Sequence, residues 1–507
     1  METGLHRLLH LRPGEAPRLL WVGAIGIAYA AATAVGNDVA EAIFITRVGA
    51  EAMPLVFLAK GAFDVLAAAL YLPLARGRSQ RQVWLVALGL YIATVIAARA
   101  AVTGGGDASA FGLFIAHETA WTILTIHWGV FVLDVFDASQ ARRLFPILFT
   151  TARLGGVIAG ILVSTLAAPL GVSNLLLFAA GFAGLTALLS LGRAEARPHA
   201  PGEDAGAPIE VGGALGGEAD AVPVGTIAGW RAALDSPLVR AIAWSTAAMV
   251  LVRYGLHMVA LGEIQAAVDG DKEAVAAFLG TFGAAANAAG IVLGVFVVPR
   301  LLHRFGVGFA NVLYAACSIG AYLGLLLWPS LGTAAGARFV HMQLKDSLKT
   351  PLSALFYGAE PPRRRSVARA FVFGAAIPLA TILVALALEA SKRVGDGLTT
   401  AALIGLAGAV LFAVACWSQN ARWRHRMIEL LRWKLDRAPP PPADRVLHLH
   451  TVLAPYRDGA SAQPLEDVAR GLASEDARLR AVAEEVLSEL IPRGRAHAIA
   501  ASVRRGA

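Results

Sequence analysis

Long apolar runs alternate with short polar loops along most of the chain. A run of about 20 apolar residues is long enough to cross the hydrocarbon core of a bilayer as a helix. We expect twelve such spans, at 18–47, 54–75, 82–102, 108–136, 146–169, 173–192, 237–266, 273–300, 306–328, 332–358, 366–391 and 397–418. The pattern therefore predicts an all-α membrane protein with twelve transmembrane helices.

The composition agrees with this interpretation. Of the 507 residues, 57% are hydrophobic and 16% are charged, which is more apolar than an ordinary soluble domain. The 52 glycines suit helices that pack closely inside a bilayer. Cys317 and Cys416 both lie in apolar runs, so the sequence predicts no disulfide framework.

The residue patterns of catalysis, metal binding and nucleotide cradling are not found. The glycine-rich run from Gly212 to Gly217 has neither a strand before it nor a helix pattern after it, as a phosphate loop requires. His341 and Lys345 do not make a zinc pair. We therefore expect no enzyme, no cofactor and no nucleic-acid partner; the expected partners are a small-molecule substrate and the lipid bilayer.

Arginines between the spans are concentrated on one side of the membrane. They are Arg76, Arg78, Arg81, Arg142, Arg143, Arg300, Arg304, Arg363, Arg364, Arg365, Arg369, Arg422, Arg424 and Arg426. The opposite loops hold only Arg47, Lys272, Lys392 and Arg393, diluted by acids. Since cytoplasmic loops carry an excess of Lys and Arg, we expect both termini in the cytoplasm, and the protein in a bacterial inner membrane.

Two pairs of motifs recur at nearly the same offset. Phe57-Leu-Ala-Lys-Gly61 stands 221 positions before Phe278-Leu-Gly-Thr-Phe282, and the stretch that begins at Gln140 stands 222 before the one that begins at Pro362. Offsets that agree within one residue at separate places indicate a duplicated six-helix unit in parallel orientation. This is the arrangement of the major facilitator fold, whose substrate site lies at the midplane between the halves.

The domain boundaries follow from these patterns. We expect six-helix bundles at 1–192 and 236–418, joined by a flexible cytoplasmic linker at 193–235 that is rich in Gly, Ala, Pro and acids. Residues 419–442 predict an amphipathic helix on the inner membrane face and a proline-rich break. Residues 443–507 read as a small soluble helical segment, solenoid-like (HEAT-like) in its spacing. Because one solenoid unit rarely stands alone, it is expected to dock on the transporter or on a cytoplasmic protein partner.

A basic stripe stands out in the tenth span. Arg338, His341, Lys345 and Lys349 recur at steps of three and four, so on an α-helix they share one face. Ionisable groups are costly in hydrocarbon, and such groups line a water-filled cavity or have partners of opposite charge. The stripe is therefore a candidate functional site.

The first and fourth spans of each half line the cavity of a parallel repeat, and those spans carry the charge. An acidic wall of the first half is expected to face a basic wall of the second. The candidate substrate-binding residues are Asp38, Glu41, Glu118, Arg253, His341, Lys345 and Lys349. Two alternatives stay open: Lys345 forms a buried ion pair with Glu118 or Glu41 that only locks the halves together, and Lys349 snorkels to the membrane surface.

Charged residues at the cytoplasmic edge suggest a gate. The candidate gate residues are Asp137, Arg142, Arg143, Arg364 and Arg365. In the second span, Lys60 and Asp64 are four residues apart, and the expected role of this couple is a structural pair.

Several of the charged stretches in the spans resemble motifs of the ATP:ADP antiporter family of plastids and intracellular bacteria, a branch of the major facilitator superfamily. The stretch from Lys345 to Tyr357 is similar to the family's Lys-x-Ser-Leu-x-x-Pro…Tyr signature, and Glu118 is similar to its span-four glutamate. The resemblance implies a nucleotide transporter in which Glu118 and Lys345 act on the substrate. Where the family has Arg and Lys around two acids in span one, this chain keeps only the acids Asp38 and Glu41.

We therefore predict a secondary transporter that works by alternating access and carries a nucleotide or a nucleotide-like anion of lower charge than ATP, because uncompensated charge in a low dielectric is costly. One alternative is proton-coupled transport of another small solute on the acidic wall. Another is a non-transporting membrane sensor or scaffold that acts through its C-terminal helices.

Overall fold

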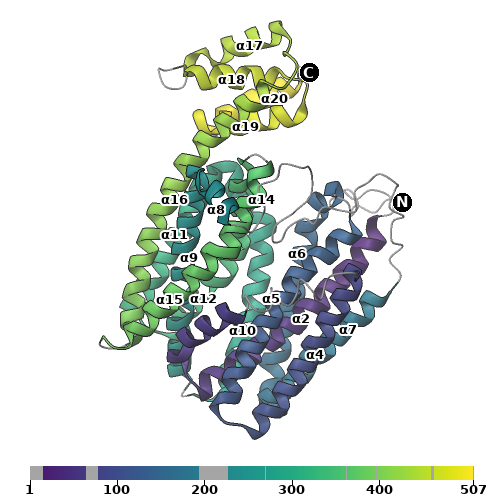
Figure 1. Ribbon diagram of the computed structural model, residues 1–507, viewed down its shortest axis with the longest axis vertical. Helices are drawn as coiled ribbons and strands as arrows, with labels where there is room; N and C mark the ends of the chain where they lie inside the picture. The colour runs from purple at the N-terminus through teal and green to yellow at the C-terminus, as the bar shows by residue number, and fades with distance from the viewer. Residues whose placement is uncertain are drawn as a thin grey trace.

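The computed structural model describes residues 15–63, 78–136, 138–192, 227–268, 270–360, 362–394, 397–457 and 462–505. Every regular element among them is helical. Eight described stretches are long and apolar enough to cross a membrane. The all-α membrane fold expected from the apolar runs is therefore confirmed, and Figure 1 shows a bundle of long helices with a smaller helical unit beyond one end.

The first half contains the helices of the predicted spans one to six. They are α2 (Glu15–Arg47), the helical segment 53–63, α4 (Gln80–Gly104), α5 (Asp107–Val135), α6 (Ala138–Leu170) and α7 (Leu176–Leu191), with the 3-10 turns η1 (Ala50–Ala52) and η2 (Val172–Leu175). Helix α2 packs against α5, α6 and α7 and buries residues around its whole circumference. A helix that is apolar all round belongs in the interior of a bundle, and this one carries the two acids of span one.

The second half has the same number of spans, several of them interrupted by wider π turns. Its elements are α8 (Ile227–Leu234), α9 (Pro237–Ala267), α10 (Lys272–Val292), η3 (Leu293–Val297), α11 (Val298–Leu327), α12 (Leu331–Phe339), η4 (Val340–Lys349), α13 (Thr350–Gly358), α14 (Pro362–Phe371), η5 (Val372–Ala376), α15 (Ile377–Ser391) and α16 (Gly397–Leu435). Gly306 breaks the helical geometry inside α11 with φ +87° and ψ 173°, a conformation that glycine adopts without steric cost. This break separates the predicted spans 273–300 and 306–328.

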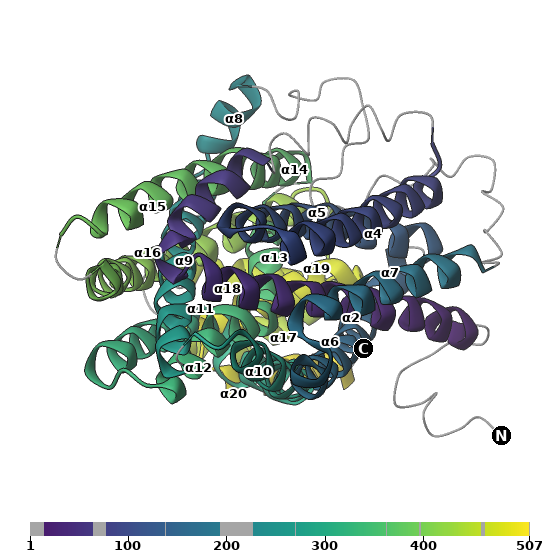
Figure 2. The same ribbon diagram turned by 90° about the horizontal axis from the view of Figure 1, so that it is seen from below.

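The two halves meet most extensively along α6 and α10, which lie side by side in Figure 2. Glycines make this approach possible: a Cβ on Gly160 would lie 2.3 Å from the carbonyl oxygen of Gly280. Close backbone contact between small residues is the usual way in which membrane helices gain packing energy. A second link joins the loop after α2 to the end of α9, where the Ala50 N–H donates to Gln265 Oε1 over 3.1 Å.

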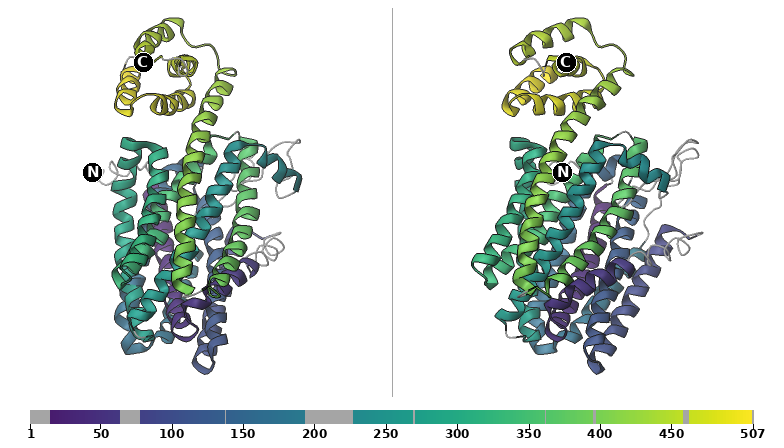
Figure 3. Two further views of the ribbon diagram at one scale, coloured as in Figure 1. Left: turned by 90° about the vertical axis from the view of Figure 1, so that its left-hand side faces the viewer. Right: turned by 60° about the vertical axis from the view of Figure 1, so that its left-hand side comes forward.

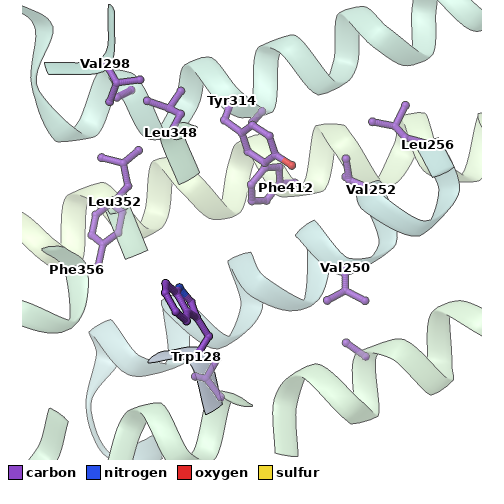
Figure 4. Packing of buried hydrophobic residues seen from close by; sticks show 14 of the residues in the cluster. Trp128, Val250, Val252, Leu256, Val298, Tyr314, Leu348, Leu352, Phe356 and Phe412 are labelled. Atoms are coloured by element: carbon purple, nitrogen blue, oxygen red, sulfur yellow. The ribbon is translucent and has the colours of Figure 1, made fainter. Parts of the chain in front are cut away.

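Buried rings and aliphatic side chains fill the interior of the second half (Figure 4). Tyr314 of α11 meets Phe412 of α16 edge to face, with centroids 5.7 Å apart. Leu352 and Phe356 extend this packing along α13, and both are fully buried. The three elements α11, α13 and α16 therefore share one apolar core.

Helix α16 differs from its prediction. The expected separate helix on the membrane surface is wrong, because one helix runs without interruption for 39 residues and passes the predicted end of the last span near 418. At about 1.5 Å per residue it is about 58 Å long, well beyond a hydrocarbon core of about 30 Å. Figure 3 shows α16 leaving the bundle and entering the terminal unit. Trp423 and Leu431 in this extension are buried because they pack against protein.

The terminal unit consists of α17 (Ala443–Leu453), the turn η6 (Ala454–Tyr456), α18 (Ala462–Ala473), α19 (Ala477–Leu490) and α20 (Arg493–Arg505). Helices α18 and α19 pack on the end of α16, and Arg432 of α16 donates to Asp467 over 2.6 Å. The expected docking of this segment on the rest of the chain is present. We call these four helices the terminal domain.

Candidate functional site

The tenth span changes its helical pitch where its charges are. Val340–Lys349 forms a π-helix, η4, with i→i+5 hydrogen bonds. Such turns hold more residues than the about 3.6 of an α-helix, so each residue rotates less, and the difference from an α-helix accumulates along the ten residues of η4. The predicted single basic stripe is therefore wrong: Arg338 and Lys349, at its two ends, face different neighbours.

Arg338 binds Glu41 of α2 across the interface of the two halves. Nη1 and Nη2 donate to Oε1 and Oε2, both over 2.5 Å, and the side chains are 3% and 1% exposed. Asn37 adds a third donor to Glu41 at 3.4 Å. The bidentate geometry makes this a strong charge-assisted contact. Glu41 thus lies between the two halves, as expected of a residue that lines the central cavity, and its ion-pair partner is Arg338.

Two histidines continue this cluster on the second half. His257 Nε2 lies 3.8 Å from Glu41 Oε1, and its ring centroid is 4.9 Å from that of His341. On the other side of Glu41 is the buried carboxyl of Asp38, which receives the Asn37 amide at 3.5 Å. Among the residues that the structure describes, Asp38 has no basic side chain within ion-pair distance.

A second cluster consists of three cations from both halves. Arg153 of α6 reaches the η4 residues Gln343 and Ser347, on either side of Lys345 in the chain, and the charges of Arg153 and of Arg253 in α9 act on Lys345. The described carboxylate that faces them is Asp346, whose Oδ1 is 2.7 Å from Lys345 Nζ. The expected ion pairs of Lys345 with Glu118 or Glu41 are therefore absent. Three cations against one carboxylate leave this region electropositive.

Arg153 was not among the predicted site residues. It reaches from α6 to η4, where Nη1 donates to Gln343 and Nη2 donates to Ser347 over 3.0 Å. Gly290 leaves the space for this contact, since a Cβ there would lie 2.0 Å from Arg153 Nη1. Its signal was present in the sequence: an arginine inside an apolar span is a functional candidate by the same rule that singled out Lys345.

Lys349 points away from the central clusters. Its Nζ is buried between α11 and α16, where it donates to Asn311 Oδ1 over 2.6 Å and lies 5.2 Å from the Phe412 ring centroid. Only 3% of the residue is exposed, so the snorkelling alternative is wrong as well. Its place in the interior of the second half makes Lys349 a packing residue with a satisfied charge.

Glu118 is paired inside its own half. Its Oε2 lies 3.6 Å from Lys60 Nζ, which also donates to Thr122 over 2.9 Å. Asp64, the expected partner of Lys60, lies outside the described residues. Asp38, Glu41 and Glu118 therefore do not form one continuous acidic wall, because each has a different set of neighbours.

The predicted gate is described only in part. Asp137 and the side chains of Arg142 and Arg143 lie outside the described residues. Arg364 is exposed, and Arg365 donates from Nη2 to the carbonyl oxygens of Gly358 and Glu360 at 3.0 and 3.2 Å. Arg365 thus closes the C-terminal end of α13, where free carbonyls need donors.

Beside this turn is a buried carboxylate that sequence reasoning missed. Glu360 is fully buried, accepts from Ser236 Oγ over 2.5 Å and lies 3.3 Å from Arg426 Nη2. These contacts tie the start of α9 to the extension of α16. In the described part of the chain, no group of three His, Cys, Asp or Glu side chains is placed to hold a metal ion.

Comparison with solved structures identifies the class of fold. The nucleoside transporter NupG matches with a TM-score of 0.55 at 12% identity, over 80% of this chain and 98% of that chain. A D-xylose–proton symporter matches with 0.56 at 12% identity, over 79% and 96%. A POT family peptide transporter in an autoinhibited state matches with 0.54 at 13% identity, over 80% and 97%.

The chain is therefore an integral membrane protein with the twelve-helix fold of major facilitator transporters. Neither the scan against family models nor the search of curated proteins finds a match. The resemblance to ATP:ADP antiporters is not confirmed by these comparisons and stays a resemblance of short motifs.

Proposed function

We propose that the protein is a secondary transporter that moves a nucleotide or a nucleotide-like anion by alternating access. The observation that carries this proposal is the cluster of Arg153, Arg253 and Lys345, which is contributed by both halves and opposed by Asp346 alone among the described residues. A site with a net positive charge in a low-dielectric interior attracts a substrate of opposite charge. Three cations suit one or two phosphate groups better than a triphosphate.

Contacts between the halves support a two-state mechanism. Arg338–Glu41 joins the halves at the centre, and Ala50–Gln265 joins them at the end opposite the terminal domain. With the terminal domain in the cytoplasm, as the positive loops predict, this is an arrangement closed on the outside. Opening that end requires these contacts to break, and binding of an anion that favours one arrangement shifts the population.

Transport by purified protein in liposomes tests the proposal. Uptake of radiolabelled AMP and ADP should be saturable and should exceed adenosine uptake. Met substitution of Lys345, Arg253 or Arg153 should lower anion uptake by roughly tenfold or more, since each removes a charge-assisted contact. Lys272→Met is the matched control, because this cation lies 47% exposed at the start of α10. Adenosine uptake that equals AMP uptake, or full activity of Lys345→Met, would contradict an anion site here.

Asp38 favours one refinement, proton coupling. Burial without a cation partner among the described residues disfavours the charged form of a carboxyl, so Asp38 is suited to carry a proton through the transport cycle. Uptake driven by an inward proton gradient and lost in Asp38→Asn supports this mode. Uptake that depends only on counter-substrate inside the liposomes supports exchange.

A further inference from the structure

The terminal domain touches the membrane part at a second place besides α16. Arg493, the first residue of α20, donates from Nη1 to the carbonyl oxygen of Leu302 at 3.3 Å and fits beside Gly306, where a Cβ would lie 2.1 Å from its Nη2. The rings of His303 and His497 stack with centroids 4.2 Å apart and an interplanar angle of 16°. The turn inside α11 and the start of α20 thus form a joint between the two parts.

A cavity of about 770 Å³ opens at this joint. Its lining residues are Val295, Pro299, Arg300, His303, Arg304, Arg493, Gly494 and His497. Five of these eight side chains are basic or imidazole, and none of the described lining residues is acidic. The nearest carboxylate in the contacts of Arg493 is Glu489, which accepts from its Nη2 at 2.5 Å.

The geometry of α20 adds to the positive potential. The N–H groups of Arg495 and Ala496 are the first that bond back to Pro492, so the preceding amides at the helix start have no helical acceptor, as is general for a first turn. The N-terminal end of a helix carries a partial positive charge that favours anions. Arginines, imidazoles and a helix start therefore converge on one hollow.

We propose that this cavity binds a phosphate-bearing anion that bridges α11 and α20 and holds the terminal domain on the membrane part. Arginine guanidinium groups match phosphate oxygens in pairs, and the volume is in the range of small-molecule sites. A phosphate also offsets the mutual repulsion of Arg300, Arg304 and Arg493. Its source is either a soluble phosphorylated solute or the head group of an acidic phospholipid, because both present the same oxygens.

Hydrogen exchange of the full-length protein gives a local readout of this site. Pyrophosphate is added at constant ionic strength to protein in phosphatidylcholine nanodiscs, and exchange is followed in 299–304 and 493–505. Titrations are run on the Lys345→Met background, so that an anion at the central cluster does not contribute. Saturable protection of both segments is the expected result for a soluble ligand.

Arg300→Gln/Arg304→Gln should weaken pyrophosphate binding roughly tenfold or more, since two charge-assisted contacts are lost. Both arginines are exposed, so folding should not depend on them. The matched control is Arg445→Gln/Arg478→Gln, which removes two exposed arginines of the terminal domain that do not line the cavity; its binding should equal that of the parent.

Nanodiscs with phosphatidylglycerol distinguish the sources. Protection that is present in phosphatidylglycerol without pyrophosphate, and is lost in the Arg300/Arg304 variant, assigns the cavity to a lipid head group. Protection that needs pyrophosphate in both lipids assigns it to a soluble phosphate. Exchange that is unchanged under all conditions, or equally changed in the control variant, overturns the proposal.

Discussion

The ion pair between Glu41 and Arg338 gives the sharpest test of how the halves are held together. Two contacts of 2.5 Å join side chains that are 1% and 3% exposed. Unit charges about 4 Å apart attract by about 4 kcal/mol at an effective dielectric constant of about 20. Burial of the two ions opposes this by several kcal/mol each, so the net contribution of the intact pair is small.

The perturbation is therefore a double-mutant cycle. Glu41→Leu leaves the Arg338 guanidinium buried beside apolar atoms, and we expect the free energy of unfolding to fall by about 3–5 kcal/mol. Arg338→Met leaves the Glu41 carboxylate buried without its guanidinium partner and should cost a similar amount. The double variant should lie within about 1–2 kcal/mol of the parent. The coupling energy is then about 3 kcal/mol or more.

Chemical unfolding of detergent-solubilised protein, followed by tryptophan fluorescence, measures all four corners of the cycle. The Lys272–Glu273 pair is a control in the same chain, with a separation of 3.5 Å and side chains 47% and 32% exposed. Its coupling should be about 0–1 kcal/mol, as is usual for surface pairs. A central coupling no larger than that of this surface pair would refute the view that Glu41–Arg338 is a desolvated contact.

Three further predictions concern separate parts of the fold. Gly160→Ala should lower stability by about 1–3 kcal/mol, because its Cβ would meet the Gly280 carbonyl at 2.3 Å; Gly181→Ala, with open space around its Cβ, should leave the thermal midpoint unchanged or raised. Lys349→Met should retain uptake within roughly threefold, since an apolar chain of similar length replaces a buried cation that contacts only its own half. Loss of uptake with unchanged stability would instead indicate that Lys349 contacts the substrate. In the terminal domain, burial raises the pKa of the Glu485 carboxyl, while Arg493 opposes the shift and Glu489 adds to it. The protonated Glu485 carboxyl therefore contributes stability that is complete below the unfolded pKa of about 4.5 and is lost as the pH rises through the raised folded pKa. Glu485→Gln should abolish this pH dependence of the thermal midpoint.

The arrangement of spans was predictable because it rests on strong, local rules. Apolar runs had to cross a bilayer, and matching offsets near Phe57 and Phe278 indicated the duplication. The separate surface helix after the last span was wrong for a physical reason: hydropathy falls at Gln419, but the helix continues, because its polar extension packs against α18 and α19. Hydropathy reports where the lipid ends, and it does not report where a helix ends.

The positions of charge inside the spans can be read from the sequence, but the partners of these charges cannot. The rule that charge in a span marks function singled out Glu41, Lys345 and Arg253, which lie in the two charged clusters, and the prediction left out Arg153. The pairing was wrong because the stripe was projected on α-helical turns, whereas η4 is a π-helix; wider turns separate Arg338 from Lys349. Nothing in the local composition of Val340–Lys349 distinguishes these two periods, since tertiary contacts with α10 and α11 stabilise the outcome.

The continuity of α16 connects the membrane part to the terminal domain mechanically. Its first turns pack on α9 and its last turns pack on α18 and α19, and Glu360 ties the start of α9 to Arg426 on the extension. The second joint, at Gly306 and Arg493, also lies in the second half. Both attachments therefore join the terminal domain to the second half. Under the proposed alternating access the terminal domain travels with the second half, and a ligand at the second joint acts on this half without touching the central cations.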